Sequence, residues 1–137
     1  IDTIAMKLVM NPQQYDVVVT TNLFGDILTD EGAGLVGGLG LAPGLCAGER
    51  HAMAQATHGS APDIAGKGIA NPYAMIMSGK MLFEWLARKR GEPKAAEAAG
   101  LIDRAMDRVI AEAKALTRDL GGTAGTAEMG DAVAAAV

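Results

Sequence analysis

The sequence has 137 residues, which is enough for one domain that buries about two-thirds of the surface its unfolded chain exposes. Its net charge of −4 argues against nucleic acid as a partner, because nucleic-acid binding needs a basic surface. Cys46 is the only cysteine and no apolar run is long enough to span a bilayer, so we expect a cytoplasmic protein that does not enter a membrane.

The first predicted element is a helix. Apolar residues recur at helical spacing from residue 2 to about residue 10, and Asn11 and Pro12 end the pattern. A β-branched run at residues 17–20 is typical of a fully buried parallel strand. The chain starts with Ile1 instead of an initiator methionine and enters a helix at once, so we expect a segment from within a longer protein.

A second helix is predicted at residues 23–35, with Thr21 or Asn22 as its N-cap. Residues 37–48 are rich in glycine and proline and indicate an irregular connection. Residues 52–57 form a weaker strand candidate.

The second half of the chain predicts helices. Asn71 and Pro72 are typical of a helix start, and Glu84 and Arg88 would form an ion pair one turn apart. Further helices are predicted at residues 93–117 and 126–136. The pattern is α/β, but two strands cannot make the sheet that these helices need to cover, so we expect further strands upstream.

The most informative stretch is the loop at residues 58–72, because loops of this length in compact domains usually bind a ligand. Its small residues let backbone N–H groups approach a ligand. His58 and Asn71 can meet a heterocycle, and Asp63 can accept hydrogen bonds from a diol. The alternatives are that Asp63, which follows Pro62, is an ordinary turn residue, and that His58 is a structural hydrogen-bonding group.

The glycines at residues 32–37 match the G-x-G-x-x-G dinucleotide pattern, but they stand at the end of a predicted helix. The Rossmann pattern requires such glycines to follow a strand and open a helix. We therefore interpret them as glycines that end a helix and allow close packing.

Asp26 and Asp30 are four residues apart, which places both carboxylates on one side of a helix, at the edge of its apolar face. Like charges at this spacing repel, and a divalent cation such as Mg²⁺ would relieve the repulsion. A solvated acidic face near the helix N-terminus is the alternative. Asp2 is a third candidate ligand, although its spacing does not indicate where it lies.

Together, residues 22–31 and 58–72 resemble the β-decarboxylating dehydrogenases, the isocitrate and 3-isopropylmalate dehydrogenase family. The resemblance covers essentially the whole chain, from Asp2 to the segment at residues 119–126. The resemblance implies an α/β fold distinct from the Rossmann fold, in which two subdomains flank a cleft, and a homodimer with a shared active site. The chain would be an incomplete fragment of that fold. Residues 1–36 would end the dimer-forming subdomain, and residues 37–137 would be the C-terminal half of the nucleotide-binding subdomain.

The resemblance also implies the site residues. Mg²⁺ or Mn²⁺ would bind Asp26 and Asp30, with a third ligand that matches Asp2 supplied by the neighbouring subunit. Asp63 would mark a preference for NAD over NADP. The implied NAD-binding residues are His58, Gly59, Ser60, Ala61, Asp63, Ile64 and Asn71.

The implied function is NAD-dependent oxidative decarboxylation of a small 2-hydroxy acid of the isocitrate or 3-isopropylmalate type. The metal would act as a Lewis acid and a template for the substrate's oxygens. We expect no catalytic residue in this chain and an inactive isolated fragment, because the family's catalytic tyrosine and lysine precede the matched segments. Gln55 replaces a glutamate that the family often has. The alternative is a catalytically inert nucleotide-binding or dimerisation remnant of that family.

Overall fold

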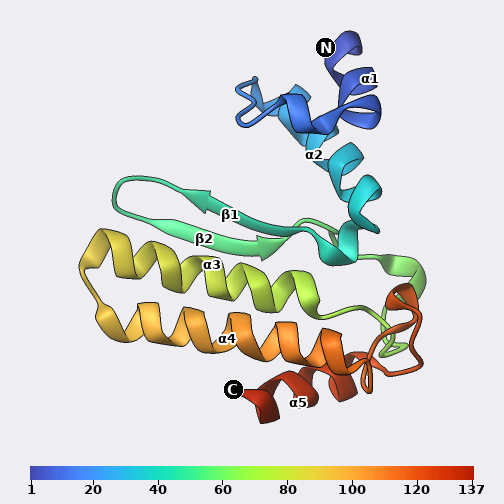
Figure 1. Cartoon of the computed structure of the whole chain (residues 1–137), viewed down its shortest axis with the longest axis vertical. Coiled ribbons are helices and arrows are strands. Elements are labelled where there is room, and N and C mark those ends of the chain that lie inside the picture. Colours follow the sequence, from blue (N-terminus) through green and yellow to red (C-terminus); the bar gives the residue numbers. More distant parts are fainter. The chain divides into compact units, whose positions relative to one another are not determined.

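In the computed structural model, which describes residues 1–137, the chain forms two compact units, residues 1–39 and residues 40–137 (Figure 1). None of the helices combines the length and the apolar character needed to cross a membrane. The assignment of the two segments to a dimer-forming and a nucleotide-binding subdomain stays a prediction.

The first unit is helical. It contains α1 (Asp2–Met10), a short 3₁₀ turn (Pro12–Gln14) and α2 (Asn22–Val36), and both predicted helices are confirmed. Thr21 is the N-cap of α2, but its side chain makes no capping hydrogen bond; its carbonyl accepts from the Gly25 N–H at 2.9 Å. The start of α2 is therefore held by its backbone.

The predicted strand at residues 17–20 is wrong. These residues are irregular, and Val17 and Val19 are 80% and 91% exposed. A buried strand needs hydrogen-bonded neighbours on both sides, and both strands of the chain lie in the other unit. β-branched composition alone therefore did not produce a strand here.

The glycine pattern at residues 32–37 ends a helix, as predicted. Residues 32–36 are the last turn of α2, and Gly37 at the C-cap has φ 122°. Its N–H donates to the carbonyls of Ala33 and Gly34. A backbone with this positive φ favours glycine, because a Cβ would be strained there.

The second unit begins with a two-stranded antiparallel sheet of β1 (Pro43–Ala47) and β2 (Ala52–Ala56). β2 confirms the weaker strand candidate, whereas β1 falls in the segment predicted as irregular. Pro43 is the first residue of β1, a position where proline's missing N–H is tolerated. The Gly44 N–H donates to Oγ of the buried Ser78 at 3.0 Å, which ties the sheet to the helix beneath it.

Three helices complete this unit: α3 (Tyr73–Arg90), α4 (Pro93–Glu112) and α5 (Thr126–Ala136). The sheet lies along α3, α3 lies beside α4, and α5 packs on α4 (Figure 1). A buried hydrophobic cluster joins α4 and α5 and consists of Ala105, Met106, Val109, Met129 and Val133. Because α5 completes this core, the segment that leads into α5 is fixed in place.

The helix predicted at residues 93–117 is shorter than expected and ends at Glu112. Ala113 takes the left-handed conformation with φ 53°, and its N–H closes the helix on the Val109 carbonyl. Thr117, which the periodicity placed at the helix end, is instead fully buried in the connection to α5.

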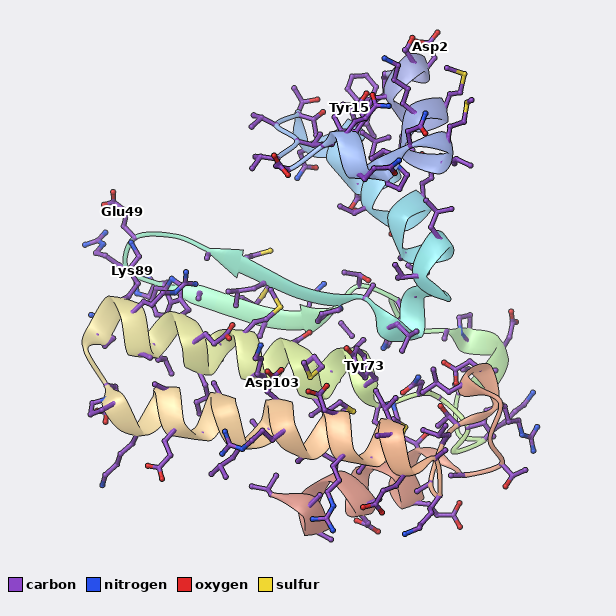
Figure 2. The ribbon with its side chains drawn as sticks, viewed as in Figure 1. Asp2, Tyr15, Glu49, Tyr73, Lys89 and Asp103 are labelled. Carbon is purple, nitrogen blue, oxygen red and sulfur yellow. The ribbon has the colours of Figure 1, made fainter.

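The predicted Glu84–Arg88 ion pair is not formed. Glu84 forms an ion pair with Lys80 instead, whose Nζ lies 3.0 Å from the Glu84 carboxylate. The same Nζ lies 3.2 Å from the carboxylate of Asp103 on α4. Asp103 lies on the side of α4 that faces α3 (Figure 2). Hydrogen bonding to Glu84, and then to Asp103, raises the pKa of Lys80. Because Lys80 lies between Glu84 on α3 and Asp103 on α4, it links the two helices, which an ion pair between Glu84 and Arg88 within α3 would not do.

A substitution at Gly122 tests how tightly the connection between α4 and α5 is packed. A Cβ at this position would lie 2.0 Å from the Leu116 carbonyl oxygen, and backbone cannot move aside cheaply. We expect Gly122→Ala to destabilise the protein by about 1–3 kcal/mol, measured by chemical denaturation. Gly79→Ala in α3 is the matched control: its Cβ would meet no atom within 4 Å, so helix propensity predicts a neutral or stabilising effect. Equal effects of the two substitutions would contradict this packing.

Candidate functional site

A cavity of 550 Å³ lies in the unit formed by residues 40–137. Its size is within the range of small-molecule sites, and its lining is mostly apolar with a few polar groups, which is typical of such sites. The lining residues are Gly40, His58, Ser60, Ala61, Ile64, Ala65, Gly66, Gly68, Ile69, Ala70, Asn71, Arg118, Asp119 and Thr126. The cavity thus joins the long loop to the segment before α5, and the two segments lie together in Figure 1.

The structure brings most of the predicted nucleotide-binding residues to this cavity. Those that line it are His58, Ser60, Ala61, Ile64 and Asn71. Gly59 and Asp63 are exposed and lie outside the lining. Asp63 is in a 3₁₀ turn (Pro62–Ile64) between two lining residues, so a ligand that reaches beyond the cavity can meet it.

The loop backbone needs small residues. Gly59, Gly66 and Gly68 have positive φ, and so does Ala61, with φ 42° and ψ 63°. A left-handed non-glycine residue is costly by about 1–3 kcal/mol and is most often found at functional sites. Ala61 lines the cavity, so this cost falls at the candidate site.

The His58 ring is oriented by its own loop. Its Nδ1 lies 2.7 Å from the Gly59 carbonyl oxygen. Because a carbonyl only accepts, Nδ1 carries the hydrogen in this contact, and Nε2 points away from it. His58 is therefore both a structural hydrogen-bonding group and a wall of the cavity.

Asn71 is buried and uses both ends of its side-chain amide. Oδ1 accepts from the N–H of Tyr73, the first residue of α3, at 2.9 Å. Asn71 therefore holds the start of the helix, although Pro72, and not Asn71 as the sequence predicts, is the N-cap residue. Nδ2 donates to Oδ2 of Asp119 at 2.8 Å. One side chain therefore fixes the end of the loop, the start of α3 and the turn that contains Asp119.

Thr126, at the start of α5, holds the last part of the loop. Its backbone N–H donates to the Gly68 carbonyl at 2.8 Å, and its hydroxyl donates to the Ala70 carbonyl at 2.5 Å. The preceding Gly125 N–H donates to the Glu128 carboxylate at 2.7 Å, which fixes the helix start itself. The loop is thus anchored to an element packed in the core.

Sequence reasoning missed all the lining residues outside the loop, which are Gly40, Arg118, Asp119 and Thr126. They lie far from the loop along the chain, and the resemblance, although it extends to residues 119–126, implies no role for Asp119 or Thr126. Arg118 is the only Lys or Arg side chain of the lining and can attract a phosphate group. Gly40 is close-packed: a Cβ there would lie 3.1 Å from Oδ2 of Asp119 and 3.3 Å from Cβ of Asn71.

The predicted metal ligands lie in the other unit. Asp26 and Asp30 are exposed, one turn apart on α2, and neither forms an ion pair. Asp2 starts α1, where its carboxylate accepts from the Thr3 N–H at 2.6 Å; this bond lowers the pKa of Asp2. The chain itself brings no group of three His, Cys, Asp or Glu side chains together. Two carboxylates suit a hard cation that takes its other ligands elsewhere.

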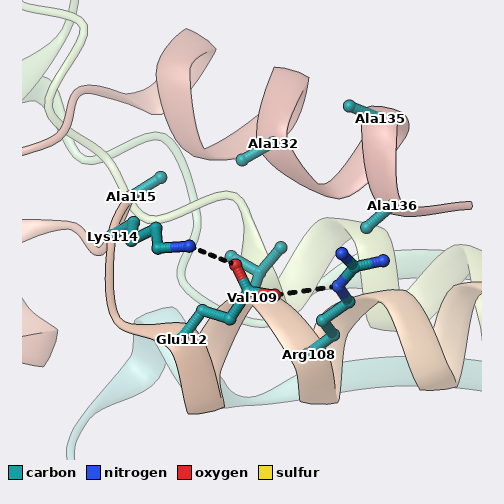
Figure 3. A pocket seen from close by; sticks show the side chains of 8 residues that line it. All are labelled: Arg108, Val109, Glu112, Lys114, Ala115, Ala132, Ala135 and Ala136. Carbon is teal, nitrogen blue, oxygen red and sulfur yellow. Dashed lines mark hydrogen bonds and ion pairs between the residues drawn. The ribbon is translucent and has the colours of Figure 1, made fainter.

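A second cavity, of 230 Å³, lies between α4 and α5 (Figure 3). Its charged residues satisfy one another, since Glu112 accepts from Arg108 at 2.9 Å and from Lys114 at 3.1 Å. The bond from Arg108, and then that from Lys114, lowers the pKa of Glu112. The rest of the lining is apolar, mainly alanine, and the positive charges of Arg108 and Lys114 are already paired with Glu112.

Comparison with known proteins gives a consistent result. A family model described as isocitrate/isopropylmalate dehydrogenase matches residues 1–133. Isocitrate/homoisocitrate dehydrogenase of Thermus thermophilus is 51% identical over the whole chain, which spans 39% of that protein. A 3-isopropylmalate dehydrogenase of Methanothermobacter thermautotrophicus is 48% identical over 98% of the chain, which spans 38% of that relative. The chain therefore spans about two-fifths of the length of these curated relatives.

Solved structures of the same family resemble this chain in fold. Isocitrate dehydrogenase from Methylococcus capsulatus has a TM-score of 0.87 and 51% identity over 98% of this chain and 38% of its own. A β-decarboxylating dehydrogenase from Thermococcus kodakarensis in its apo form has a TM-score of 0.78 and 38% identity, with the same coverage. These likenesses confirm the fold and the family resemblance that the two motifs imply.

A substitution at Thr126 tests whether its hydroxyl anchors the loop at residues 58–72. We expect Thr126→Val to lower stability by about 1 kcal/mol and to raise hydrogen exchange at residues 66–71, because the Ala70 carbonyl loses its hydroxyl donor. Thr123→Val is the matched control, since Thr123 is exposed and its hydroxyl makes no hydrogen bond within the chain. Unchanged exchange in the loop of Thr126→Val would show that the hydroxyl does not anchor it.

Proposed function

Because the chain belongs to the isocitrate/isopropylmalate dehydrogenase family, we propose that it forms part of an NAD- and Mg²⁺-dependent oxidative decarboxylase of a 2-hydroxy acid. The substrate would be of the isocitrate or 3-isopropylmalate type. Since the chain spans 39% of its Thermus relative, the proposal concerns the whole protein. The observation that carries it is the cavity built from the loop at residues 58–71 and the turn with Asp119.

The cavity supports the adenosine half of a dinucleotide as ligand. Its apolar walls, which include Ile64 and Ile69, can pack on a flat base, and polar groups of His58, Asn71 and Asp119 can orient that base. Arg118 adds a positive charge for the phosphates. In this proposal the residues of this chain would hold NAD⁺, which when bound would supply the acceptor for a hydride from the hydroxyl-bearing carbon of the substrate. The ketone so formed would take up the electron pair of the bond to the β-carboxylate, so that CO₂ could leave.

Asp26 and Asp30 would hold the metal, with Asp2 of the partner subunit as a third ligand. When bound, Mg²⁺ supplies Lewis-acid polarisation and a template for the substrate's oxygens. Both carboxylates are exposed and free of cationic partners, so they are available for a cation. A homodimer would bring the third ligand, and α2 exposes apolar side chains, Leu23 and Ile27, at 66% and 56%, that such an interface would cover. We place the protein in the cytoplasm.

The metal assignment predicts the effect of Asp26→Asn in the full-length protein. We expect kcat/KM to fall by at least ~100-fold and Mg²⁺ binding, measured by calorimetry, to weaken, because an amide replaces an anionic ligand. Asp16→Asn is the control: it removes the same charge from an exposed residue of the same unit that forms no ion pair. Turnover equal to that of the unsubstituted protein in Asp26→Asn would refute the assignment.

The cofactor assignment predicts a preference for NAD. We expect kcat/KM with NAD to exceed that with NADP by at least ~10-fold, because the Asp63 carboxylate would repel a 2′-phosphate. Asp63→Ser should narrow this ratio, whereas Asp131→Ser, an exposed site on α5, should leave it unchanged. Equal rates with both cofactors would mean that Asp63 does not face the ribose. Absence of turnover with either cofactor would favour an inert remnant of the family.

A further inference from the structure

Two hydrogen bonds fix which way the Asn71 side chain points its oxygen and its nitrogen. The Tyr73 N–H can only donate, so the atom that faces it at 2.9 Å is Oδ1. The Asp119 carboxylate can only accept, so the atom that faces it at 2.8 Å is Nδ2. The flipped amide would set donor against donor and acceptor against acceptor. Asn71 therefore has one orientation.

This orientation leaves a defined pair of groups for a ligand. Nδ2 of Asn71 keeps a second N–H, and Oδ1 of Asp119 accepts no hydrogen bond within the chain. Both residues line the 550 Å³ cavity, although Asn71 is only 8% exposed. The cavity wall thus offers a donor next to an acceptor, held together by the Asn71–Asp119 bond.

Purine bases differ in the pattern that matches this pair. Adenine offers its ring nitrogen N1 as an acceptor next to the 6-amino group as a donor. Hypoxanthine and guanine offer the reverse, a protonated N1 next to the acceptor O6. A site built to hydrogen-bond one pattern discriminates against the other, because its polar groups are then left facing like groups.

We infer that Asp119 determines the base specificity of the cavity: it accepts from the 6-amino group of adenine and aligns Asn71 to donate to the ring nitrogen. The inference rests on the proposed function, because it takes the adenosine half of NAD as the occupant. The Asp119 carboxylate is the reason why the cavity binds a 6-amino purine in preference to a 6-oxo purine. Asp119 has this role because it both holds Asn71 and lines the cavity.

The test compares NADH with its 6-oxo counterpart, reduced nicotinamide hypoxanthine dinucleotide, by calorimetric Kd on the full-length protein. We expect the unsubstituted protein to bind NADH at least ~10-fold more tightly. Asp119→Asn keeps an oxygen that can accept from Asn71 but replaces the free carboxylate oxygen with an NH₂ donor. In this variant we expect the ratio of the two Kd values to fall to about one or to invert, with the hypoxanthine dinucleotide bound more tightly than before.

The control is Asp131→Asn, which removes one charge from an exposed residue on α5 outside the cavity and should leave the ratio unchanged. A purely structural role of Asp119 would weaken both dinucleotides by the same factor in Asp119→Asn, and this outcome overturns the inference while the proposed function stands. A ratio near one in the unsubstituted protein overturns it in the same way, even if the variant does not fold. Failure to bind either dinucleotide overturns the proposed function together with the inference.

Discussion

The candidate site depends on the two hydrogen bonds made by the side chain of Asn71. One holds the start of α3 at the Tyr73 N–H, and the other reaches Asp119, 48 residues further along the chain. A buried amide is costly unless its polar atoms are paired, so these partners also allow the side chain to be buried at 8% exposure. Thr126 adds two bonds from the start of α5 to the carbonyls of Gly68 and Ala70. A loop made of small residues thereby gains a defined shape from two helices packed in the core.

The fold shows where sequence patterns are reliable. The helices at α1, α2, α3 and α5 follow from periodicity and from breakers such as Pro12 and Gly37, because both signals are local. The strand predicted at residues 17–20 failed because strand formation depends on neighbours that a propensity cannot provide. β1 was missed for the opposite reason: its proline and glycine disfavour a strand, but pairing with β2 and packing on α3 form one.

The candidate nucleotide site was likewise predictable only where the signal is local in the sequence. The loop was found because a histidine, an aspartate and an asparagine stand at fixed points among glycines, and five of the seven NAD-binding residues that the resemblance implies line the cavity. The facing wall, with Arg118 and Asp119, could not be derived from spacing, because contacts between distant segments depend on how α4 and α5 pack. α4 also ended earlier than its periodicity indicated, at Glu112, and the freed residues lead into that wall. For the metal, helical spacing placed Asp26 and Asp30 one turn apart, but a ligand from a second subunit lies beyond what one chain can show.

The central claim is that the cavity between the loop and the turn at Asp119 holds the adenosine half of NAD. A crystal structure of the full-length protein with NADH tests this claim most directly. We predict that the adenine lies in this cavity, within hydrogen-bond distance of Asn71 and Asp119, with its ribose hydroxyls toward Asp63. A dinucleotide bound elsewhere, or an adenine in this cavity that contacts neither side chain, would contradict the claim.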